Sequence, residues 1–336
     1  MTAPKELGFA VLGCGRIGRM HAQVLGRHPK ARLVSVYDVV AEAAAATAGE
    51  LGVGQAADIA AVLGDPAVDA VLIASPTDTH VALIVQAVRA GKAVLCEKPI
   101  DLDTGRAAAC WAEIEPFDPV IMIGFNRRFD PSFQALRDRV VAGEIGRLEH
   151  VVITSRDPAP PPVAYLRGSG GLFRDMTIHD FDMARYLAGD IVEVQAFGAN
   201  LVDPEIGAAG DIDAAMITLR AASGALIHIG NSRRASYGYD QRLEAFGSQG
   251  MLQAGNRRAT TVQSWGARAT AAQDPVLEFF IARYQEAYAA EIDHFIESVL
   301  RRTPVRASFA DGLAALRLAD AAEQSMRTGR SVRLDA

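Results

Sequence analysis

The sequence has few cysteines and no long apolar run, and both features restrict the kind of protein that it encodes. Its three cysteines, Cys14, Cys96 and Cys110, cannot all pair and show no CxxC spacing. We therefore expect free thiols in a reducing, cytoplasmic setting and no metal site. A run of about 18 apolar residues is absent, so no membrane span is predicted. At the N-terminus, Lys5 and Glu6 interrupt the apolar core that a signal peptide needs.

An excess of basic charge is also missing. The chain has 34 Lys and Arg against 40 Asp and Glu, a net charge of -6. Proteins that bind nucleic acid carry a strong basic surplus, so we expect no nucleic-acid partner. Half of the residues are apolar and 22% are charged, as in an ordinary globular protein. The length of 336 residues is sufficient for two domains.

Short apolar runs alternate with helix-length segments through the first third of the chain. Continuous apolar strands separated by helices are typical of a parallel sheet covered on both faces, with right-handed connections. Residues 1–125 are therefore predicted to form an α/β, doubly wound Rossmann domain. The expected strands are Leu7–Leu12, Arg32–Tyr37, Ala70–Ala74, Ala93–Cys96 and Val120–Phe125. The expected helices are Ile17–Arg27, Ala41–Leu51, Thr79–Ala90 and Thr104–Ile114.

The pattern changes after about residue 126. Alternating apolar and polar residues fill segments such as LEHVVITSRD, VEVQAFGANL and ALIHIGNSRR, which turn residues separate. This alternation indicates antiparallel strands, and residues 278–300 and 311–327 are expected to be closing helices. Residues 126–336 are thus predicted to be an α+β domain on a large, mostly antiparallel open sheet.

The motif GCGRIG follows the first predicted strand and opens the first helix. In the pattern G-x-G-x-x-G, Gly13 permits a tight turn, Gly15 lets the backbone approach a pyrophosphate, and Gly18 lets helix and strand pack closely. Asp38 ends the second strand, where an acid would bind the adenosine ribose diol. It would repel a 2′-phosphate, which favours NAD over NADP. Gly13, Gly15, Arg16, Ile17, Gly18 and Asp38 are the candidate NAD contacts here.

Two further strand ends contribute candidate cofactor contacts, because ligands of such sheets bind outside the carboxyl ends of the strands. SPTDTH supplies Ser75, Thr77 and His80, although His80 could equally belong to the first turn of a helix. CEKP supplies Glu97 and Lys98, and a lysine at this end of a strand would reach a substrate beside the nicotinamide.

The stretch GGLFRDMTIHDFDMAR places acids and a histidine in an otherwise apolar context. If the segment is helical from Asp175, then Asp175, His179, Asp182 and Tyr186 share one face. Three interpretations remain open at this point: a capping acid with a core histidine, a metal-binding pair, or acid–base groups that work with a nicotinamide cofactor.

The motifs together resemble the Gfo/Idh/MocA oxidoreductases. GCGRIG, TDTH, EKP and GFNRRFDP followed by a D-x-x-x-H helix form this resemblance, which spans essentially the whole chain. RDMTIHDFDMAR and YGYD are similar to stretches of the inositol 2-dehydrogenases within that family. The resemblance implies a homotetramer and a Lys, Asp and His that act together, here Lys98, Asp175 and His179. It also implies substrate contacts from these three and from Arg127, Asp157, Asp182 and Tyr237.

The resemblance leads us to expect NAD-dependent oxidation of myo-inositol to scyllo-inosose (2-keto-myo-inositol). A secondary alcohol must lose its proton as its hydride leaves, and histidine is the side chain that ionises closest to neutral pH. We therefore expect His179 to be the base, Asp175 to orient it and Lys98 to stabilise the alkoxide. Alternatives are a dehydrogenase of scyllo-inositol, D-chiro-inositol or glucose, and a non-catalytic nucleotide sensor.

Overall fold

The computed structural model describes residues 6–334, so Lys5 lies outside the described residues. The chain divides into two compact units. The first contains residues up to 129 together with 286–316, and the second contains 130–285 together with the residues from 317 onward. Among residues 6–334, no helix is long and apolar enough to cross a membrane.

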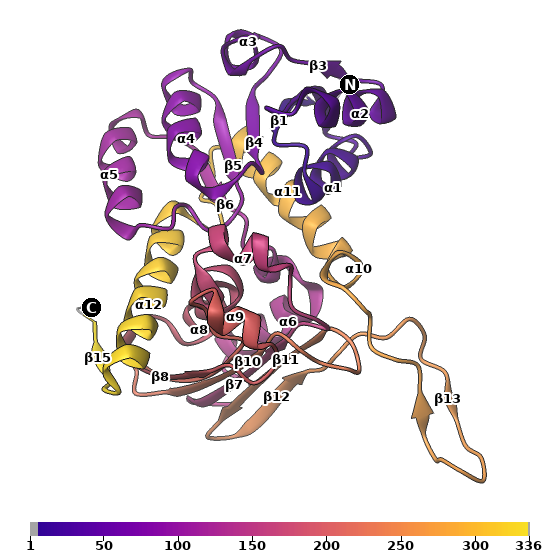
Figure 1. Ribbon diagram of the computed structural model, residues 1–336, viewed down its shortest axis with the longest axis vertical. Coiled ribbons are helices and arrows are strands. Elements are labelled where there is room, and N and C mark those ends of the chain that lie inside the picture. The colour runs from indigo at the N-terminus through magenta and orange to yellow at the C-terminus, as the bar shows by residue number, and fades with distance from the viewer. Residues whose placement is uncertain (1–5, 335–336) are drawn as a thin grey trace. The chain divides into compact units, whose positions relative to one another are not determined.

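The sheet of the first unit is parallel and six-stranded, in the order β3-β2-β1-β4-β5-β6 (Figure 1). Every residue of β1 and β4 is buried, which explains why these strands read as continuous apolar runs. The strand order reverses between β1 and β4, and in such sheets ligands bind beside that point. The predicted doubly wound domain is confirmed. Its strands are β1 (Leu7–Leu12), β2 (Ala31–Tyr37), β3 (Gly54–Gln55), β4 (Ala70–Ile73), β5 (Ala93–Cys96) and β6 (Ile121–Ile123).

Helices cover both faces of this sheet. In Figure 1, α1 and α2 lie on one side of the strands, and α4 and α5 lie on the other. The sequence pattern missed the short β3 and α3. The helices within the first 129 residues are α1 (Arg16–Leu25), α2 (Ala41–Leu51), α3 (Ile59–Gly64), α4 (His80–Arg89) and α5 (Thr104–Ile114).

Helix α11 (Gln285–Arg301) packs on the first unit, although the sequence analysis placed it in the second domain. The Phe295 ring lies 6.0 Å from the Phe9 ring, and the Tyr288 ring lies 5.4 Å from His21. The predicted division into 1–125 and 126–336 therefore differs from the two units. The apolar face of a helix is visible in a sequence, whereas the surface that it packs against is not.

The second unit is built on a seven-stranded sheet in the order β12-β11-β7-β10-β9-β8-β15. All of its strand pairs are antiparallel except β7 with β10, so the predicted mostly antiparallel sheet is confirmed. The strands are β7 (Leu148–Arg156), β8 (Ile191–Ala199), β9 (Ala214–Ala221), β10 (Leu226–Ser232), β11 (Asp240–Gly247), β12 (Gly250–Ala254) and β15 (Val332–Arg333).

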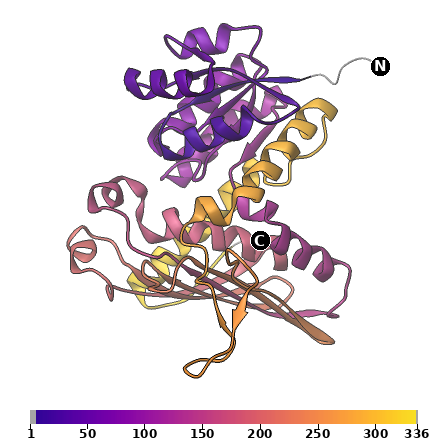
Figure 2. The ribbon, with the colours of Figure 1, turned by 90° about the vertical axis from the view of Figure 1, so that its right-hand side faces the viewer.

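Helices of the second unit gather on one face of its sheet (Figure 2). The helices are α6 (Pro131–Val141), α7 (Val163–Ser169), α8 (Ile178–Ala188), α9 (Pro204–Ala208), α10 (Phe280–Arg283) and α12 (Phe309–Thr328), of which α12 spans the unit boundary. The opposite face, here called the outer sheet face, carries exposed apolar side chains. They are Val152, Phe197, Met216, Leu226, Phe246 and Met251.

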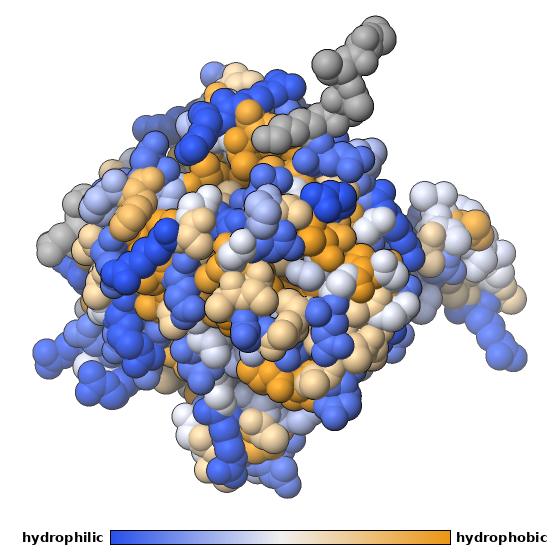
Figure 3. Space-filling model, turned by 90° about the horizontal axis from the view of Figure 1, so that it is seen from above, coloured by the Kyte–Doolittle hydropathy of each residue, from blue (hydrophilic) through white to orange (hydrophobic). Residues whose placement is uncertain are grey.

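A hairpin of β13 (Gln263–Ser264) and β14 (Ala272–Gln273) extends away from this sheet. Figure 3 shows it standing apart at the right, with hydrophilic and hydrophobic residues interspersed. Val262 and Trp265 are exposed on it.

Glu291, on α11, is a carboxyl group buried in the first unit. Within residues 6–334, neither of its oxygens has a hydrogen-bond partner, and the side chain is fully buried. Burial, together with the negative charge of Glu97, raises the pKa of Glu291 well above its ordinary value. Burial therefore favours the neutral, protonated form of this carboxyl group.

We expect Glu291→Gln to raise the melting temperature at about pH 7 but not at about pH 4. In the unfolded chain the glutamic acid ionises above about pH 4.3, whereas in the folded chain it keeps its proton to higher pH. The wild type therefore loses stability as the pH rises from the unfolded pKa towards the folded one, and a glutamine avoids this loss. Thermal unfolding at both pH values measures the gain. An equal difference between the two proteins at both pH values would contradict this account.

Candidate active site

The glycine-rich loop after β1 has the shape that a pyrophosphate requires. Gly13 has a φ of +101°, and a Cβ there would lie 2.6 Å from the backbone of Ala74. A Cβ on Gly18 would lie 1.8 Å from the carbonyl oxygen of Gly13. At the exposed Gly15, by contrast, a Cβ would meet no atom within 4 Å. Helix α1 begins directly after it, at Arg16, with no side-chain cap, so its free N–H groups fit a phosphate.

Asp38, at the end of β2, is tied to this loop. Its Oδ2 accepts a hydrogen bond from the backbone N–H of Cys14 at 2.6 Å, and its Oδ1 accepts one from Val40 at 2.8 Å. Val39 is 84% exposed and supplies no cation for a 2′-phosphate. Arg16 is exposed and Ile17 half-buried at the start of α1. The residues present fit NAD.

The segment after β4 contributes Ser75, Thr77 and His80. Ser75 and Thr77 are half-buried, whereas His80 is buried. The His80 ring lies between two backbone carbonyl groups, with Nδ1 2.8 Å from the oxygen of Pro99 and Nε2 2.9 Å from that of Ser75. His80 therefore links the segments that follow β4 and β5. The contact with the cofactor that the sequence suggested for His80 stays a prediction.

Glu97 and Lys98 follow β5, and both are half-buried. Glu97 Oε1 lies 2.8 Å from His21 Nε2, and its Oε2 accepts from the Lys98 backbone N–H at 3.3 Å. A Cβ on Gly124 would lie 3.1 Å from Glu97 Oε2, so a larger residue at position 124 would crowd the carboxylate. The backbone at Lys98 is thus held by a carboxylate that His21 in turn holds.

Arg127 and Arg128 are both buried in a 3₁₀ turn, Asn126–Phe129. The Arg128 guanidinium pairs with Asp311 at 3.1 Å and donates to the carbonyl oxygen of Arg306. Arg128 is therefore used within the first unit, and a substrate contact from Arg127 remains a prediction.

In the second unit, the segment from Asp175 to Asp182 begins in a π-helix rather than in the predicted α-helix. Phe173–Thr177 has the i→i+5 pattern, and α8 starts only at Ile178. Asp175 and His179 are half-buried, but Asp182 is 1% exposed. π-turns are rare and occur frequently at functional sites. The expected stripe therefore begins in a π-turn, and Asp182 is its one buried member, since Tyr186 is half-buried like Asp175 and His179.

The carboxylate of Asp175 is held at both oxygens. The Tyr165 hydroxyl donates to Oδ1 at 2.8 Å, and the Arg233 guanidinium donates to Oδ2 from two nitrogens at 3.2 Å. Although 53% of Tyr165 is exposed, desolvation and the negative charge of Asp175 raise its pKa, so the hydroxyl keeps the proton that it donates.

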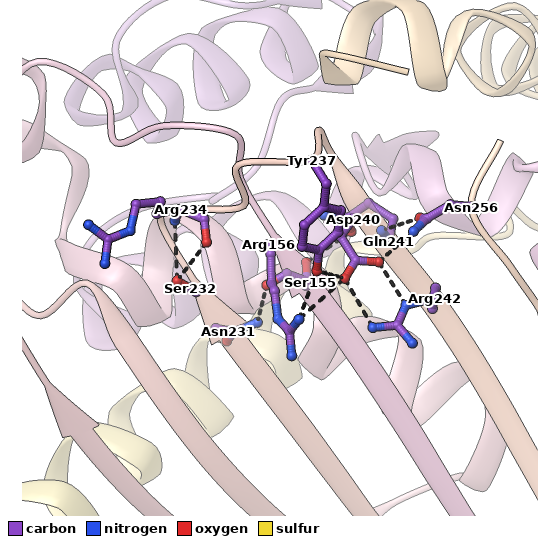
Figure 4. Close-up of polar contacts among 10 residues, drawn as sticks. All are labelled: Ser155, Arg156, Asn231, Ser232, Arg234, Tyr237, Asp240, Gln241, Arg242 and Asn256. Atoms are coloured by element: carbon purple, nitrogen blue, oxygen red, sulfur yellow. Dashed lines mark hydrogen bonds and ion pairs between the residues drawn. The ribbon is translucent and has the colours of Figure 1, made fainter. Parts of the chain in front are cut away.

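Two other predicted substrate contacts lie at the ends of strands in the second unit. The half-buried Asp157 follows β7, and its backbone N–H donates to the Ser232 carbonyl oxygen at 2.9 Å. The Tyr237 hydroxyl donates to Asp240 at 2.6 Å and accepts from Arg156 at 2.8 Å (Figure 4). Tyr237 is 48% exposed, and its contact with the substrate stays a prediction.

Sequence reasoning missed Tyr165, Arg233 and His21. Arg233 stands in the segment NSRR, but nothing there distinguishes a buried arginine from the exposed Arg234 beside it. The strict alternation of β10 provides the one available signal, because it predicts that successive side chains point to opposite faces.

Comparisons with known proteins identify one oxidoreductase family for both parts of the chain. Residues 7–125 match the family described as "Oxidoreductase family, NAD-binding Rossmann fold", and residues 133–253 match the "GFO/IDH/MocA C-terminal domain". The inositol 2-dehydrogenase of Rhizobium meliloti (strain 1021) is 49% identical over 96% of this chain and 98% of that protein.

Solved structures of inositol dehydrogenases are similar to this chain over nearly its whole length. The crystal structure of a myo-inositol dehydrogenase from Corynebacterium glutamicum superposes with a TM-score of 0.95 at 48% identity, over 98% of this chain and 99% of that one. A scyllo-inositol dehydrogenase from Lactobacillus casei, solved with bound NAD(H) and scyllo-inositol, gives 0.91 at 29% identity over 98% and 99%. With its glycine loop, Asp38 and both family domains in place, the chain belongs to the NAD-binding Gfo/Idh/MocA oxidoreductases.

Proposed function

We propose that this oxidoreductase oxidises myo-inositol at its axial hydroxyl group, forming scyllo-inosose, with NAD as the acceptor. The names of its relatives support an inositol as the substrate. The observation that carries the proposal is the Asp175 carboxylate, which is held at both oxygens and lies four residues before a half-buried histidine. An acid fixed in this way is suited to orienting a base.

Each catalytic side chain has a separate task. His179 takes the proton of the substrate hydroxyl, because an imidazole ionises near neutral pH. Asp175 orients His179 and stabilises its protonated form. Lys98 donates a hydrogen bond to the oxygen as it gains alkoxide character. NAD, when bound, supplies the hydride acceptor at C4 of its nicotinamide.

The substrate contacts that we propose are polar, as a polyol requires. Every hydroxyl of an inositol both donates and accepts, so its site needs fixed charged and polar groups. The donor is the guanidinium group of Arg127, and the acceptors are the carboxylates of Asp157 and Asp182. The hydroxyl group of Tyr237 can both donate and accept. Arg127 and Asp182 are the buried members of this set. A site that pairs each hydroxyl rejects analogues that lack one.

The experiment that tests this function is the reduction of NAD and NADP, followed by NADH or NADPH absorbance, with myo-inositol, scyllo-inositol, D-chiro-inositol and glucose. We expect the highest kcat/KM with myo-inositol and NAD. Turnover of another polyol alone would replace the substrate but keep the reaction class. Tight NADH binding without turnover of any polyol would favour the nucleotide sensor, which has no need of acid–base groups.

We further propose that the protein is a homotetramer that assembles through the outer sheet face. Six exposed apolar side chains on neighbouring strands support this, because exposed patches of this kind often mark contacts between proteins. Light scattering should give the mass of four chains, and a monomer would contradict it.

The thiols of Cys14, Cys96 and Cys110 are free and buried, which supports a reducing, cytoplasmic setting.

A further inference from the structure

Asp211 fixes the backbone at the start of the segment that carries Asp175. Gly170 and Gly171 have φ values of +82° and +83°, and the π-helical turn follows directly. Asp211 Oδ1 accepts from the backbone N–H of Leu172 at 2.9 Å, and a Cβ on Gly171 would lie 3.0 Å from the same oxygen. The backbone before Asp175 is therefore held by a side chain from a different loop.

Arg233, which follows β10, places a buried positive charge against this segment. The arginine is 1% exposed, and its guanidinium donates twice to Asp175 Oδ2 and lies 3.7 Å from Asp211 Oδ2. A buried charge is costly unless opposite charges compensate it. Here two carboxylates do so, and one of them belongs to the proposed acid–base pair.

Tyr165, on α7, completes the arrangement from the other side. Its hydroxyl donates to Asp175 Oδ1, so the two oxygens have different partners and the carboxylate cannot rotate without losing a hydrogen bond. Asp157 is also close enough to contribute to the raised pKa of Tyr165. The charged groups around the tyrosine are thus Asp157, Asp175 and Arg233.

We propose that Arg233 and Tyr165 are positioning residues. They fix the carboxylate of Asp175 and weaken the stabilisation that its negative charge gives to protonated His179. This inference rests on the proposed function. Residues four apart in a helical segment are neighbours, so Asp175 and His179 share one side of the segment. A free carboxylate would stabilise a protonated histidine strongly and keep it from acting as a base at neutral pH. The arginine and the phenol hydroxyl offset part of that negative charge, so that His179 remains available to accept a proton.

The test compares Arg233→Met, Arg233→Lys and Tyr165→Phe with the matched control Arg234→Met. Arg234 is the exposed neighbour, bonded to Ser232 and to the Leu201 carbonyl oxygen, and it points away from the cluster around Tyr237 (Figure 4). The first readout is deuterium exchange at Cε1 of His179 against pH, measured by mass spectrometry on the full chain. Its midpoint reports the protonation of the ring without any turnover.

We expect the midpoint to rise by about half a unit or more in Arg233→Met, since loss of a nearby positive charge favours the protonated ring. Tyr165→Phe should shift it in the same direction by less, and Arg233→Lys and Arg234→Met should leave it near wild type. The kinetic readout is a fall in kcat of about tenfold or more in Arg233→Met. KM should be nearly unchanged, and the acid limb of the pH profile should move to higher pH.

An unchanged midpoint in Arg233→Met would overturn the proposal and leave Arg233 a structural residue. If that variant does not fold, Tyr165→Phe decides, because it removes one hydroxyl and leaves the buried charges paired. A Tyr165→Phe midpoint equal to wild type would then overturn it. Wild-type protein that turns over no polyol would instead contradict the proposed function, and the exchange measurement would remain interpretable.

Discussion

We expect replacement of His179 by alanine to lower kcat for myo-inositol by roughly 10²-fold or more, because a positioned base contributes about that much. Without the imidazole, the hydroxyl proton has no acceptor near neutral pKa while the C–H bond is breaking. Affinity for NADH should stay close to wild type, since His179 lies in the second unit and the glycine loop in the first. Initial rates and NADH fluorescence titration measure the two effects separately.

Lys98→Ala should cost a similar factor through loss of the hydrogen bond to the developing alkoxide. In the proposed mechanism both groups act on one reacting oxygen and are therefore not independent, so we expect the double variant to be little worse than either single variant. The control is Arg89→Ala, which removes an exposed cation from the last turn of α4. If NADH affinity collapses in both His179→Ala and Lys98→Ala, these residues serve the cofactor instead.

Among the substitutions proposed here, we expect Arg283→Met to lower the free energy of unfolding the most. Arg283 and Asp130 are each 1% exposed and form an ion pair inside the second unit. Asp130 also caps α6, accepting from the backbone N–H groups of Ser132 and Phe133 at 3.1 Å each. Removing the arginine leaves a buried carboxylate oxygen without its cation, which typically costs about 3–5 kcal/mol.

Urea unfolding of the variant measures this loss, and two further variants isolate its cause. Arg139→Met breaks an exposed pair with Glu144, so it should cost at most about 1 kcal/mol. Asp130→Asn combined with Arg283→Met removes both charges and should recover part of the stability while keeping a capping oxygen. A double variant as unstable as Arg283→Met would show that the guanidinium acts through its packing on Phe133 and Tyr284 instead.

The first unit was largely predictable because its signals are local. A strand, the glycine motif and a helix follow one another along the chain, and Gly13 and Gly18 each have a steric reason to be glycine. The bounds predicted for β1, β5, α2 and α5 agree with the structure. Helix α11 was expected as a helix within residues 278–300, but its place in the first unit was not predicted, because its partners, such as Phe9, lie far away in the sequence.

The candidate site was predictable only in part. Residue type and spacing identified Asp175 and His179, but the π-turn at Phe173–Thr177 depends on tertiary contacts that no periodicity shows. Arg233 is informative only once its burial is known, since most arginines are exposed. The amino acids that carry the chemistry were thus recognisable, whereas those that hold them in place required the structure.

The proposed reaction moves a hydride from the carbon that bears the axial hydroxyl of myo-inositol to NAD. Turnover of myo-inositol carrying deuterium at that carbon tests it most directly, with the cofactor and the organic product both analysed by mass spectrometry and NMR. We expect one deuterium at C4 of the reduced nicotinamide and a product ketone that has lost the label. Reduced cofactor without deuterium, or a ketone at another carbon with the label retained, would contradict it.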